Sequence, residues 1–377
     1  MKILYCIASY SSKGGTEKVL SSKASFLAEN GHDVTILISD QHNRPMAYPL
    51  SRNVKIKDLK ITSVLKGRIK FIGFIQNVLE LRKMYKREIE LINPDVIIVL
   101  ERGYEDFVIP YVLKDIPKIR EYHTSRKAFN LLDRQLPFFA RLRKKLLRIV
   151  YENQYKKYDK LVLLTQKDLK SWRDYTNVTV IPNVIEYAQD KTDENILTRR
   201  KRIIAVGSMM NDQKGFSNLI AIWSKIEKDF PEWSLNIYGD GALRSYYQKL
   251  IDRLELKKIF LKGISDQIIE KYNESQIFVM TSNGEGFGLV IVEALSQKVP
   301  VIAYDCYCGP SDILVNDKGG FLIDFGDEEQ FVTQLKTLMS DDALRQSKSL
   351  EASEVAKNFT TEMIMPKWIN LFNELKR

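Results

Sequence analysis

The feature that most constrains this chain is an alternation of short β-branched runs with longer amphipathic segments, which continues from end to end. In the first half, strand-like runs lie at residues 2–8, 33–39, 54–59, 95–100, 118–123, 160–165 and 178–182, and the longest helical pattern covers 69–91. In the second half, strand-like runs lie at 202–207, 234–238, 259–262, 276–281, 299–304 and 320–323, with helical patterns at 216–230, 241–256, 266–273, 288–297 and 328–339. Such alternation is typical of α/β proteins in which parallel sheets carry helices on both faces. One set in each half predicts two Rossmann-like domains.

A polar, charged stretch at residues 186–201 has no strand-like run and predicts the hinge between the halves. We therefore expect an N-terminal domain at residues 1–183 and a C-terminal domain at 184–358. A last helix at 359–377 is expected to return to the N-terminal domain, and Pro366 should kink it.

Composition excludes several other classes of protein. Hydrophobic residues make up 44% and charged residues 28% of the chain, as in ordinary globular proteins. The apolar runs at 96–100 and 107–113 are far shorter than the roughly 20 residues of a membrane span, and we expect no signal peptide. Three cysteines without a Cys-x-x-Cys pair favour reduced thiols in a cytoplasmic protein, and they form no metal-ligand pattern with the three histidines.

The basic excess of the chain lies entirely in its first half. Residues 1–190 carry 34 Lys/Arg and 21 Asp/Glu, whereas residues 191–377 carry 24 and 27. A nucleic-acid-binding protein, a membrane-surface protein and an enzyme with acidic substrates all have such a charge balance.

One basic segment, at residues 134–158, has the pattern of an amphipathic helix. It follows Pro137 and places four apolar residues at helical spacing: Phe138, Leu142, Leu146 and Ile149. Four basic residues interleave with this stripe: Arg141, Lys144, Lys145 and Arg148. The pattern is typical of a helix on a membrane surface. The alternative is an ordinary domain helix whose apolar stripe packs on its sheet.

Open parallel sheets bind ligands at the carboxyl ends of their strands, so the loops after strands are the candidate sites. After the first strand, Gly14 and Gly15 precede a helix, where backbone N–H groups can approach a phosphate; a turn that binds nothing is the alternative. A second loop, at residues 281–288, contains Glu285 and leads into a helix that contains Glu293. Carboxylates beside a helix N-terminus indicate a hydroxyl-rich ligand such as a sugar or ribose. Helix capping by Glu285 and a solvated position for Glu293 are the alternatives.

The Glu-x7-Glu segment from Glu285 to Glu293 resembles the donor-binding motif of the retaining glycosyltransferases of family 4, which have the GT-B fold. Other pieces resemble that family in the same order along nearly the whole chain: Gly14-Gly15-Thr16-Glu17, Asn30-Gly31-His32-Asp33-Val34, Ile181-Pro182-Asn183, Val206-Gly207…Lys214-Gly215, Tyr238-Gly239-Asp240-Gly241, Leu261-Lys262-Gly263 and Gly309-Pro310-Ser311-Asp312. The resemblance implies two Rossmann-like parallel-sheet domains facing a central cleft. It also implies that the N-terminal domain holds the acceptor and the C-terminal domain the nucleotide sugar.

The resemblance implies roles for individual residues. Glu285 would contact the donor sugar and Glu293 the ribose, while Lys214 would neutralise the diphosphate. Gly15 would close over the diphosphate from the other domain, and His123 would line the reacting sugar. The backbone of four residues would face the sugar and diphosphate: Gly286, Phe287, Gly288 and Leu289. The family usually has an arginine where this chain has Ser208, so Ser208 with backbone amides, or another cation, must replace it.

Together these features imply a retaining transferase that moves a hexose or N-acetylhexosamine from a nucleotide diphospho-sugar, with UDP-sugars first and GDP-mannose next. The acceptor would be a saccharide or lipid-linked saccharide in cell-surface polysaccharide biosynthesis, and the enzyme would be cytoplasmic and peripheral at the inner face of the cell membrane. We expect no metal or other cofactor, because positive groups of the protein would stabilise the charge on the leaving diphosphate and no Asp-x-Asp motif is present.

Three alternatives remain weaker. A sugar-nucleotide epimerase of the same fold should lack the Glu285 to Glu293 segment. A nucleic-acid-binding protein should show one of the known recognition motifs. A dinucleotide oxidoreductase should carry Gly-x-Gly-x-x-Gly after its first strand.

Overall fold

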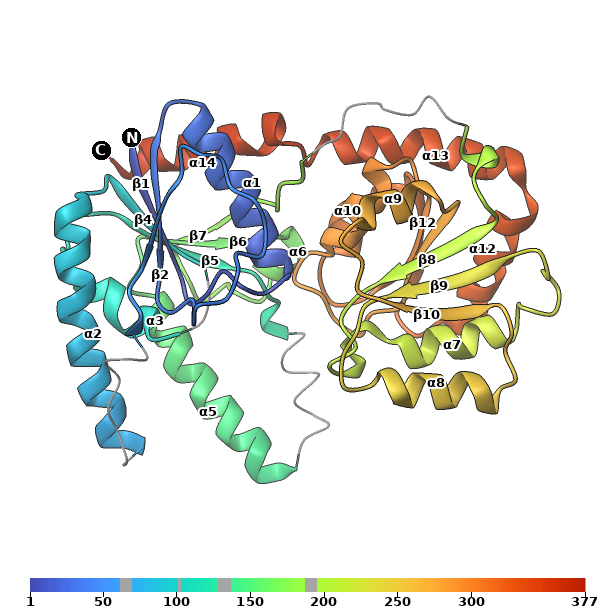
Figure 1. The fold of residues 1–377 in the computed structure, drawn as a ribbon, viewed down its shortest axis with the longest axis horizontal. Coiled ribbons are helices and arrows are strands. Elements are labelled where there is room, and N and C mark those ends of the chain that lie inside the picture. Colours follow the sequence, from blue (N-terminus) through green and yellow to red (C-terminus); the bar gives the residue numbers. More distant parts are fainter. Residues whose placement is uncertain (62–69, 101–102, 128–136, 187–194, 377) are drawn as a thin grey trace. The chain divides into compact units, whose positions relative to one another are not determined.

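The computed structural model describes residues 1–61, 70–100, 103–127, 137–186 and 195–376. They form two compact units, each built on one parallel sheet (Figure 1). Unit 1 comprises Met1–His123, Asp133–Val184 and Thr361–Arg377, and unit 2 comprises Thr124–Leu132 and Ile185–Thr360. The prediction of two Rossmann-like parallel-sheet domains is confirmed. Half of the expected hinge at 186–201, namely residues 187–194, lies outside the described residues.

The sheet of unit 1 has seven parallel strands in the order β3-β2-β1-β4-β5-β6-β7. Their bounds are β1 Lys2–Ile7, β2 Asp33–Ile38, β3 Lys55–Asp58, β4 Val96–Val99, β5 Lys118–Tyr122, β6 Lys160–Leu163 and β7 Val178–Val180. The chain starts at β1 in the middle, runs outward to β3 and then crosses back to β4. The strand order therefore reverses between β1 and β4, which is where open α/β sheets bind ligands.

Helices cover both faces of this sheet. One face carries α1 (Gly15–Glu29) and α14 (Thr361–Leu375), which contact each other. The other face carries α2 (Lys70–Ile92), α3 (Glu105–Val108), η2 (Ile109–Tyr111) and α5 (Phe138–Tyr155), while α6 (Gln166–Leu169) lies against β6 and β7. Alternate side chains of β1 pack against the helices on the two faces of the sheet, because successive side chains of a strand point to opposite sides. Leu4 and Cys6 pack with α2, whereas Tyr5 lies beside Lys23 of α1.

The sheet of unit 2 has six parallel strands in the order β10-β9-β8-β11-β12-β13. Their bounds are β8 Arg202–Val206, β9 Ser234–Tyr238, β10 Ile259–Gly263, β11 Ile277–Met280, β12 Val301–Asp305 and β13 Gly320–Asp324. The helical elements are η3 Ile196–Thr198, η4 Asp212–Lys214, α7 Phe216–Ser224, α8 Arg244–Arg253, α9 Ile268–Asn273, α10 Leu289–Ser296, α11 Pro310–Ile313, η5 Val315–Asp317, α12 Glu328–Ser340 and α13 Asp342–Lys357. The order of the strands reverses between β8 and β11, so the loops after these two strands lie at the corresponding ligand-binding position.

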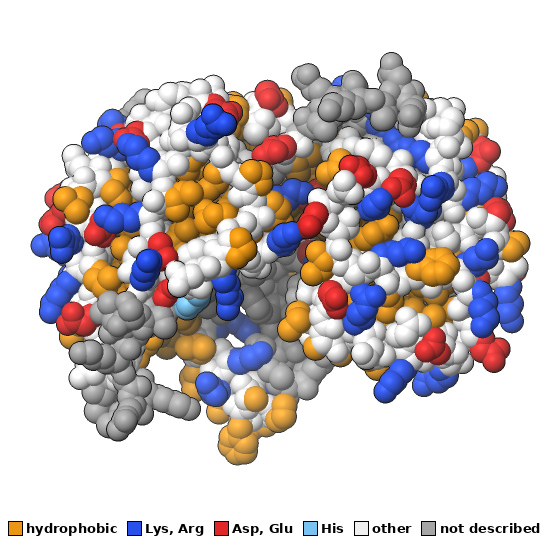
Figure 2. Space-filling view, viewed as in Figure 1, with side chains coloured by type: hydrophobic (Ala, Val, Ile, Leu, Met, Phe, Trp, Pro, Cys, Tyr) orange, Lys and Arg blue, Asp and Glu red, His pale blue; other side chains and the backbone are white. Residues whose placement is uncertain are grey.

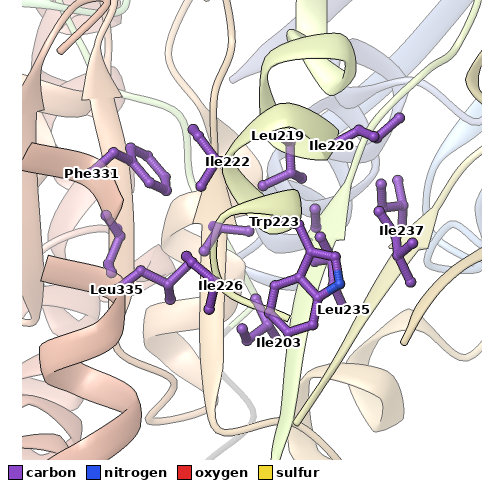
Figure 3. Close-up of a cluster of buried hydrophobic side chains, with 14 of the residues drawn as sticks. Ile203, Leu219, Ile220, Ile222, Trp223, Ile226, Leu235, Ile237, Phe331 and Leu335 are labelled. Atoms are coloured by element: carbon purple, nitrogen blue, oxygen red, sulfur yellow. The ribbon is translucent and has the colours of Figure 1, made fainter. Parts of the chain in front are cut away.

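The core of unit 2 fixes α7 against the sheet (Figure 3). Trp223 of α7 is fully buried and lies beside Ile203 of β8 and Leu235 of β9. On the other side, Phe331 and Leu335 bring α12 into the same cluster. Phe216, the first residue of α7, belongs to the same cluster, so the packing also holds the start of the helix, directly after the η4 turn.

Among the longer described helices, two differ from the sequence prediction. Helix α7 ends at Ser224 rather than near residue 230, and the chain continues in turns towards Pro231, which disfavours helical backbone at the residue before it. Helix α13 was not predicted, because its buried face is formed by small and polar residues: Arg345, Ser349, Ala352, Ser353, Val355 and Ala356. The buried guanidinium of Arg345 lies 5.2 Å from the ring centre of Trp233 and donates to the backbone oxygen of Met339 at 3.3 Å.

Candidate functional site

The loops after β8 and β11 bring Lys214 and Glu285 together. The ammonium of Lys214 lies 2.7 Å from Glu285 Oε1, and the two side chains are 22% and 8% exposed. This contact depends on Gly215, which has a φ of +64°. A Cβ atom at Gly215 would lie 2.0 Å from the backbone oxygen of Thr281, so only glycine lets the η4 turn lie directly on the end of β11.

Hydrogen bonds fix the loop that carries Glu285. Ser282 Oγ donates to Glu285 Oε1 at 2.7 Å, so one carboxylate oxygen accepts from both a hydroxyl and an ammonium group. The side chain of Asn283 donates to the backbone oxygen of Asp212 at 2.7 Å. The side chain of Gln213 donates to the backbone oxygen of Gly284 at 2.9 Å. The Glu285 loop and the Lys214 turn are therefore one connected structure.

Gly288 is the N-cap residue of α10 and has a φ of +90°, so it turns the chain from the Glu285 loop into the helix. Between these residues, Phe287 is buried and its ring lies 5.5 Å from that of Phe359. Gly309 packs directly against the backbone of Phe287, and a Cβ atom at Gly309 would lie 2.0 Å from the backbone oxygen of Phe287. The first N–H groups of a helix such as α10 have no partner within the helix and favour an anion.

Glu293 lies on the buried side of α10, where it is 7% exposed. The hydroxyl of Tyr272 donates to Glu293 Oε2 at 3.1 Å. Burial, followed by the nearby Glu293 carboxylate, raises the pKa of Tyr272, so the phenol stays protonated and donates this bond. The alternative of a solvated carboxylate at Glu293 is therefore wrong. Tyr272 was not recognised in the sequence, where nothing distinguishes it from an ordinary core aromatic residue.

Ser208 follows the end of β8, at the position where the resemblance leads one to expect an arginine. The side chain is exposed, and its hydroxyl accepts a hydrogen bond from the Met210 N–H at 3.3 Å. Ser208 therefore stabilises the local turn, and it supplies no positive charge.

In unit 1, the loop after β1 leads into α1 through Gly14, the N-cap residue, and Gly15, the first helical residue. Glu17 in the first turn is buried and folds back towards Gly14, where a Cβ atom would lie 2.6 Å from the carboxylate. Burial raises the pKa of Glu17, against the effect of hydrogen bonds from its own N–H and from Ser12. Gly15 thus lies at a helix N-terminus at the reversal point of the sheet, as the phosphate-loop hypothesis requires.

His123 directly follows β5, and its side chain is 8% exposed. Its Nε2 atom lies 3.1 Å from Glu121 Oε2, and the other carboxylate oxygen accepts from the buried Lys23. Burial lowers the pKa of His123, although Glu121 opposes this effect, so the imidazole is held neutral. Lys23 and Glu121 were not recognised in the sequence, although the Glu-x-His spacing places both side chains on one face of a strand.

The amphipathic helix predicted after Pro137 is α5, but its apolar stripe does not pack on the sheet. The C-terminal end of α5 is anchored, since the ring of Tyr151 meets that of Phe107 edge to face, with centres 5.0 Å apart, and Gln154 accepts from the Tyr111 hydroxyl at 2.7 Å. The first half extends away from the sheet, and hydrophobic side chains gather with basic ones at its end (Figures 1 and 2). Seven apolar residues of α5, up to Val150, are 43–82% exposed: Phe138, Phe139, Leu142, Leu146, Leu147, Ile149 and Val150.

Three of the four basic residues predicted for this helix are exposed in the same segment of α5, namely Arg141, Lys144 and Lys145. Arg148 differs, because it is only 8% exposed and belongs to the anchored side of the helix. We therefore define the α5 surface by the seven exposed apolar residues together with Arg141, Lys144 and Lys145.

Comparisons with known proteins match both halves of the chain. The family model described as "Glycosyltransferase Family 4" matches residues 13–189, and the one described as "Glycosyl transferases group 1" matches residues 187–355. The chain is a family 4-like glycosyltransferase. It is 28% identical over 385 residues to the amylovoran biosynthesis glycosyltransferase AmsD of Erwinia amylovora, with 99% of each chain covered.

A second relative of this glycosyltransferase is the Campylobacter jejuni protein named "GalNAc-alpha-(1->4)-GalNAc-alpha-(1->3)-diNAcBac-PP-undecaprenol alpha-1,4-N-acetyl-D-galactosaminyltransferase", which is 23% identical over 379 residues and covers 100% of this chain and 99% of its own. A mutant of S. aureus TarM, solved in complex with Fondaparinux, alpha-GlcNAc-glycerol and UDP, has the same GT-B fold, with a TM-score of 0.77 and 16% identity over 99% of both chains. The transferase is thus related to enzymes of bacterial surface-polysaccharide biosynthesis.

The described part of this glycosyltransferase contains no group of three or more His, Cys, Asp or Glu side chains that could hold a metal ion. Among the described helices, none is both long enough and apolar enough to span a membrane. Within unit 2, the structure brings together Lys214, Glu285 and the N-terminus of α10. Gly15 and His123 belong to unit 1, and their roles towards the donor stay predictions.

Proposed function

We propose that this glycosyltransferase retains the anomeric configuration and transfers a hexose or N-acetylhexosamine from a UDP-sugar, without a metal ion, to a saccharide or lipid-linked acceptor of a cell-surface polysaccharide. The observation that carries the proposal is the contact of Lys214 and Glu285 beside the start of α10. A cation, a carboxylate and the positive end of a helix together fit a ligand with both an anionic diphosphate and sugar hydroxyls.

The proposed chemistry follows from the charge that develops when the sugar leaves. Negative charge grows on the β-phosphate, and preorganised positive groups at this position lower the barrier. Lys214 and the N-terminus of α10 would supply such groups, one through its contact with Glu285 and the other where the Glu285 loop enters the helix. Glu285 would then orient the sugar through its hydroxyl groups, while Glu293 would take the ribose. Attack of the acceptor from the side of the departing phosphate, which takes the acceptor's proton, would retain the configuration.

The test is transfer from radiolabelled UDP-sugars to saccharide and lipid-linked acceptors, with the anomeric configuration of the product read by NMR. Glu285→Ala should abolish transfer and leave the unfolding temperature near that of the wild type. Glu329→Ala, at an exposed carboxylate on α12, is the matched control and should behave as wild type. Inversion of configuration, or epimerisation of the UDP-sugar without transfer, would contradict the proposal.

The α5 surface supports a further part of the proposal, namely that the enzyme works at the cytoplasmic face of the cell membrane on a membrane-linked acceptor. The surface combines exposed aromatic and aliphatic side chains with basic ones, which is the combination that binds the interface of an anionic bilayer. Unit 1 also contains most of the first half of the chain, where the basic excess lies. The Campylobacter jejuni relative is named for an undecaprenol-linked acceptor, which is consistent with this proposal.

Co-sedimentation with anionic liposomes tests the docking. Each basic residue near an anionic surface contributes about 1 kcal/mol, so changing Arg141, Lys144 and Lys145 to Ser should weaken binding roughly 100-fold. Changing Lys249, Lys257 and Lys258 of unit 2 to Ser alters the charge equally and should leave binding intact; all three are exposed. Phe138→Ser with Phe139→Ser should weaken binding without any change of charge. Equal binding by all variants, or preferential binding of an oligonucleotide, would contradict membrane docking.

A further inference from the structure

A buried charged cluster lies beneath His123 in unit 1. Lys23 of α1 and Glu121 of β5 form an ion pair in which both side chains are 1% exposed. The ammonium of Lys23 lies 3.9 Å from the ring centre of Trp368 in α14 and 5.5 Å from that of Tyr5 in β1. A buried ion pair is costly to desolvate, so its presence needs a reason beyond stability.

The hydrogen bonds of the cluster determine the tautomer of His123. Although burial alone would raise the pKa of Glu121, the Lys23 ammonium and the His123 N–H lower it to about 2. An ionised carboxylate can only accept hydrogen bonds. One oxygen of Glu121 accepts from Lys23, and the other lies 3.1 Å from His123 Nε2. Nε2 must therefore carry the proton, which leaves Nδ1 as an acceptor with no hydrogen-bond partner among the described residues.

The other charged groups near the imidazole do not change this assignment. Arg120 precedes Glu121 on β5 and points to the opposite face of the sheet, where it pairs with Asp106 at 2.7 Å. Tyr5 has a pKa raised by burial and then by Glu121, so it stays neutral. Lys23 itself lies on the far side of the carboxylate. Its pKa is lowered by burial, but the carboxylate opposes this effect.

We propose that Lys23 and Glu121 are positioning residues, which hold His123 as the neutral Nε2–H tautomer and present Nδ1 as a hydrogen-bond acceptor to a hydroxyl of the reacting sugar. The last clause rests on the proposed function, whereas the tautomer does not. The ion pair is needed for this hydrogen bond to His123, because the positive charge of Lys23 keeps the buried Glu121 ionised. Trp368 and Tyr5 exclude water from the ammonium and stabilise it through their ring faces.

The cluster makes an unusual prediction for Glu121→Gln. The ammonium of Lys23 can only donate, so the amide oxygen of the new side chain must face Lys23 and its NH2 group must face His123. The NH2 group donates to Nε2, which moves the histidine proton to Nδ1. Removing the ammonium as well, in Lys23→Met with Glu121→Gln, lets the amide rotate, accept from Nε2–H and restore the original tautomer. Adding Lys23→Met should therefore restore the His123 tautomer that Glu121→Gln changes.

The experiment uses the full chain labelled with 15N-histidine, whose three histidines are distinguished by the loss of one signal in His123→Asn. Imidazole 15N shifts should show Nε2–H in the wild type, Nδ1–H in Glu121→Gln and Nε2–H again in the double variant. The kcat should fall roughly 10- to 100-fold in Glu121→Gln, as for other partners that orient a functional histidine, with little change in donor KM, and should largely recover in the double variant. Thermal unfolding verifies that each variant folds.

The outcomes separate the two proposals. An unchanged tautomer in Glu121→Gln, or a switched tautomer with an unchanged kcat, would overturn the positioning role. A double variant that is no better than the single one would also overturn it, because a merely structural ion pair predicts no repair. If the wild type transfers no sugar from any UDP-sugar, the proposed function fails, while the 15N shifts still decide the tautomer.

Discussion

The contact between Lys214 and Glu285 can be dissected by a double-mutant cycle, because the two residues touch in the free enzyme but are assigned different parts of the donor. The variants are Lys214→Met, Glu285→Gln and the two combined. We expect Lys214→Met to lower kcat about 100- to 1,000-fold, which is the usual effect of removing one group that stabilises developing negative charge. We expect Glu285→Gln to lower kcat roughly 10- to 100-fold, because a charged hydrogen bond to a sugar hydroxyl becomes a neutral one.

The structure predicts different coupling in the two measurements. In the free enzyme the ion pair is 2.7 Å long and Glu285 is only 8% exposed, so either single substitution leaves a poorly solvated partner. Unfolding in urea should therefore show a coupling free energy of about 1 kcal/mol between the two sites. In the proposed donor complex, Lys214 would face the diphosphate and Glu285 the sugar. The effects on the activation free energy should then add to within about 0.5 kcal/mol.

The refuting result is a double variant whose kcat equals that of Lys214→Met alone. That outcome would mean that Glu285 acts only by holding Lys214, and the assignment of Glu285 to the sugar would be wrong. A change in KM for the donor without a change in kcat would instead show that Lys214 binds the ground state and the transition state equally.

Two further predictions concern stability. Gly309→Ala and Gly326→Ala both place a side chain at a positive φ, of +99° and +87°, but only the first meets the backbone, at Phe287, whereas the second has nothing within 4 Å. In urea unfolding, the strained backbone should lower the free energy of unfolding of both variants by about 1–2 kcal/mol. Gly309→Ala should lower it further and should bind UDP-sugar less well. Equal losses of stability would contradict the close packing at Phe287. His123 has a pKa that burial lowers, so protons bind the unfolded chain more strongly and the free energy of unfolding should fall as the pH drops from about 6.5 towards the folded-state value. His123→Asn should flatten that part of the profile in urea unfolding at pH 7.5 and 5.5, and an unchanged slope would show that His123 is not the group responsible.

The periodicity of the sequence predicts the elements of both sheets, because parallel strands buried on both faces read as short β-branched runs. Helix α13 is not predicted from periodicity, since its buried face consists of Arg345 and mainly small residues and has no apolar stripe. Along α5 the apolar spacing is correctly recognised, but spacing alone does not reveal whether the stripe is covered. The structure leaves it exposed, and buries Arg148, which the sequence pattern groups with the exposed basic residues.

The candidate site is predictable only where its residues lie within one motif. Glu285 and Glu293 are separated by eight positions on a loop and its helix, so one segment contains both. Tyr272 reaches Glu293 from α9, and Lys23 reaches Glu121 from 98 positions away in the sequence. Such partners are set by the packing of distant elements, and a buried lysine has no sequence signature that distinguishes it from a solvated one.

The way the chain divides between its two units constrains the order in which a ribosome can complete them. Helix α14 leaves the ribosome after all of unit 2, yet its Trp368 covers Lys23, which is made before any of unit 2. Until α14 is made, the α1 face of unit 1 is therefore uncovered, and the ion pair of Lys23 and Glu121 is open to water. Both segments of unit 2, Thr124–Leu132 and Ile185–Thr360, are made before α14, so unit 2 can fold first. A chain shortened just before α14 should thus contain a folded unit 2 and a protease-sensitive unit 1, in contrast to the usual N-terminal-first order of domain folding.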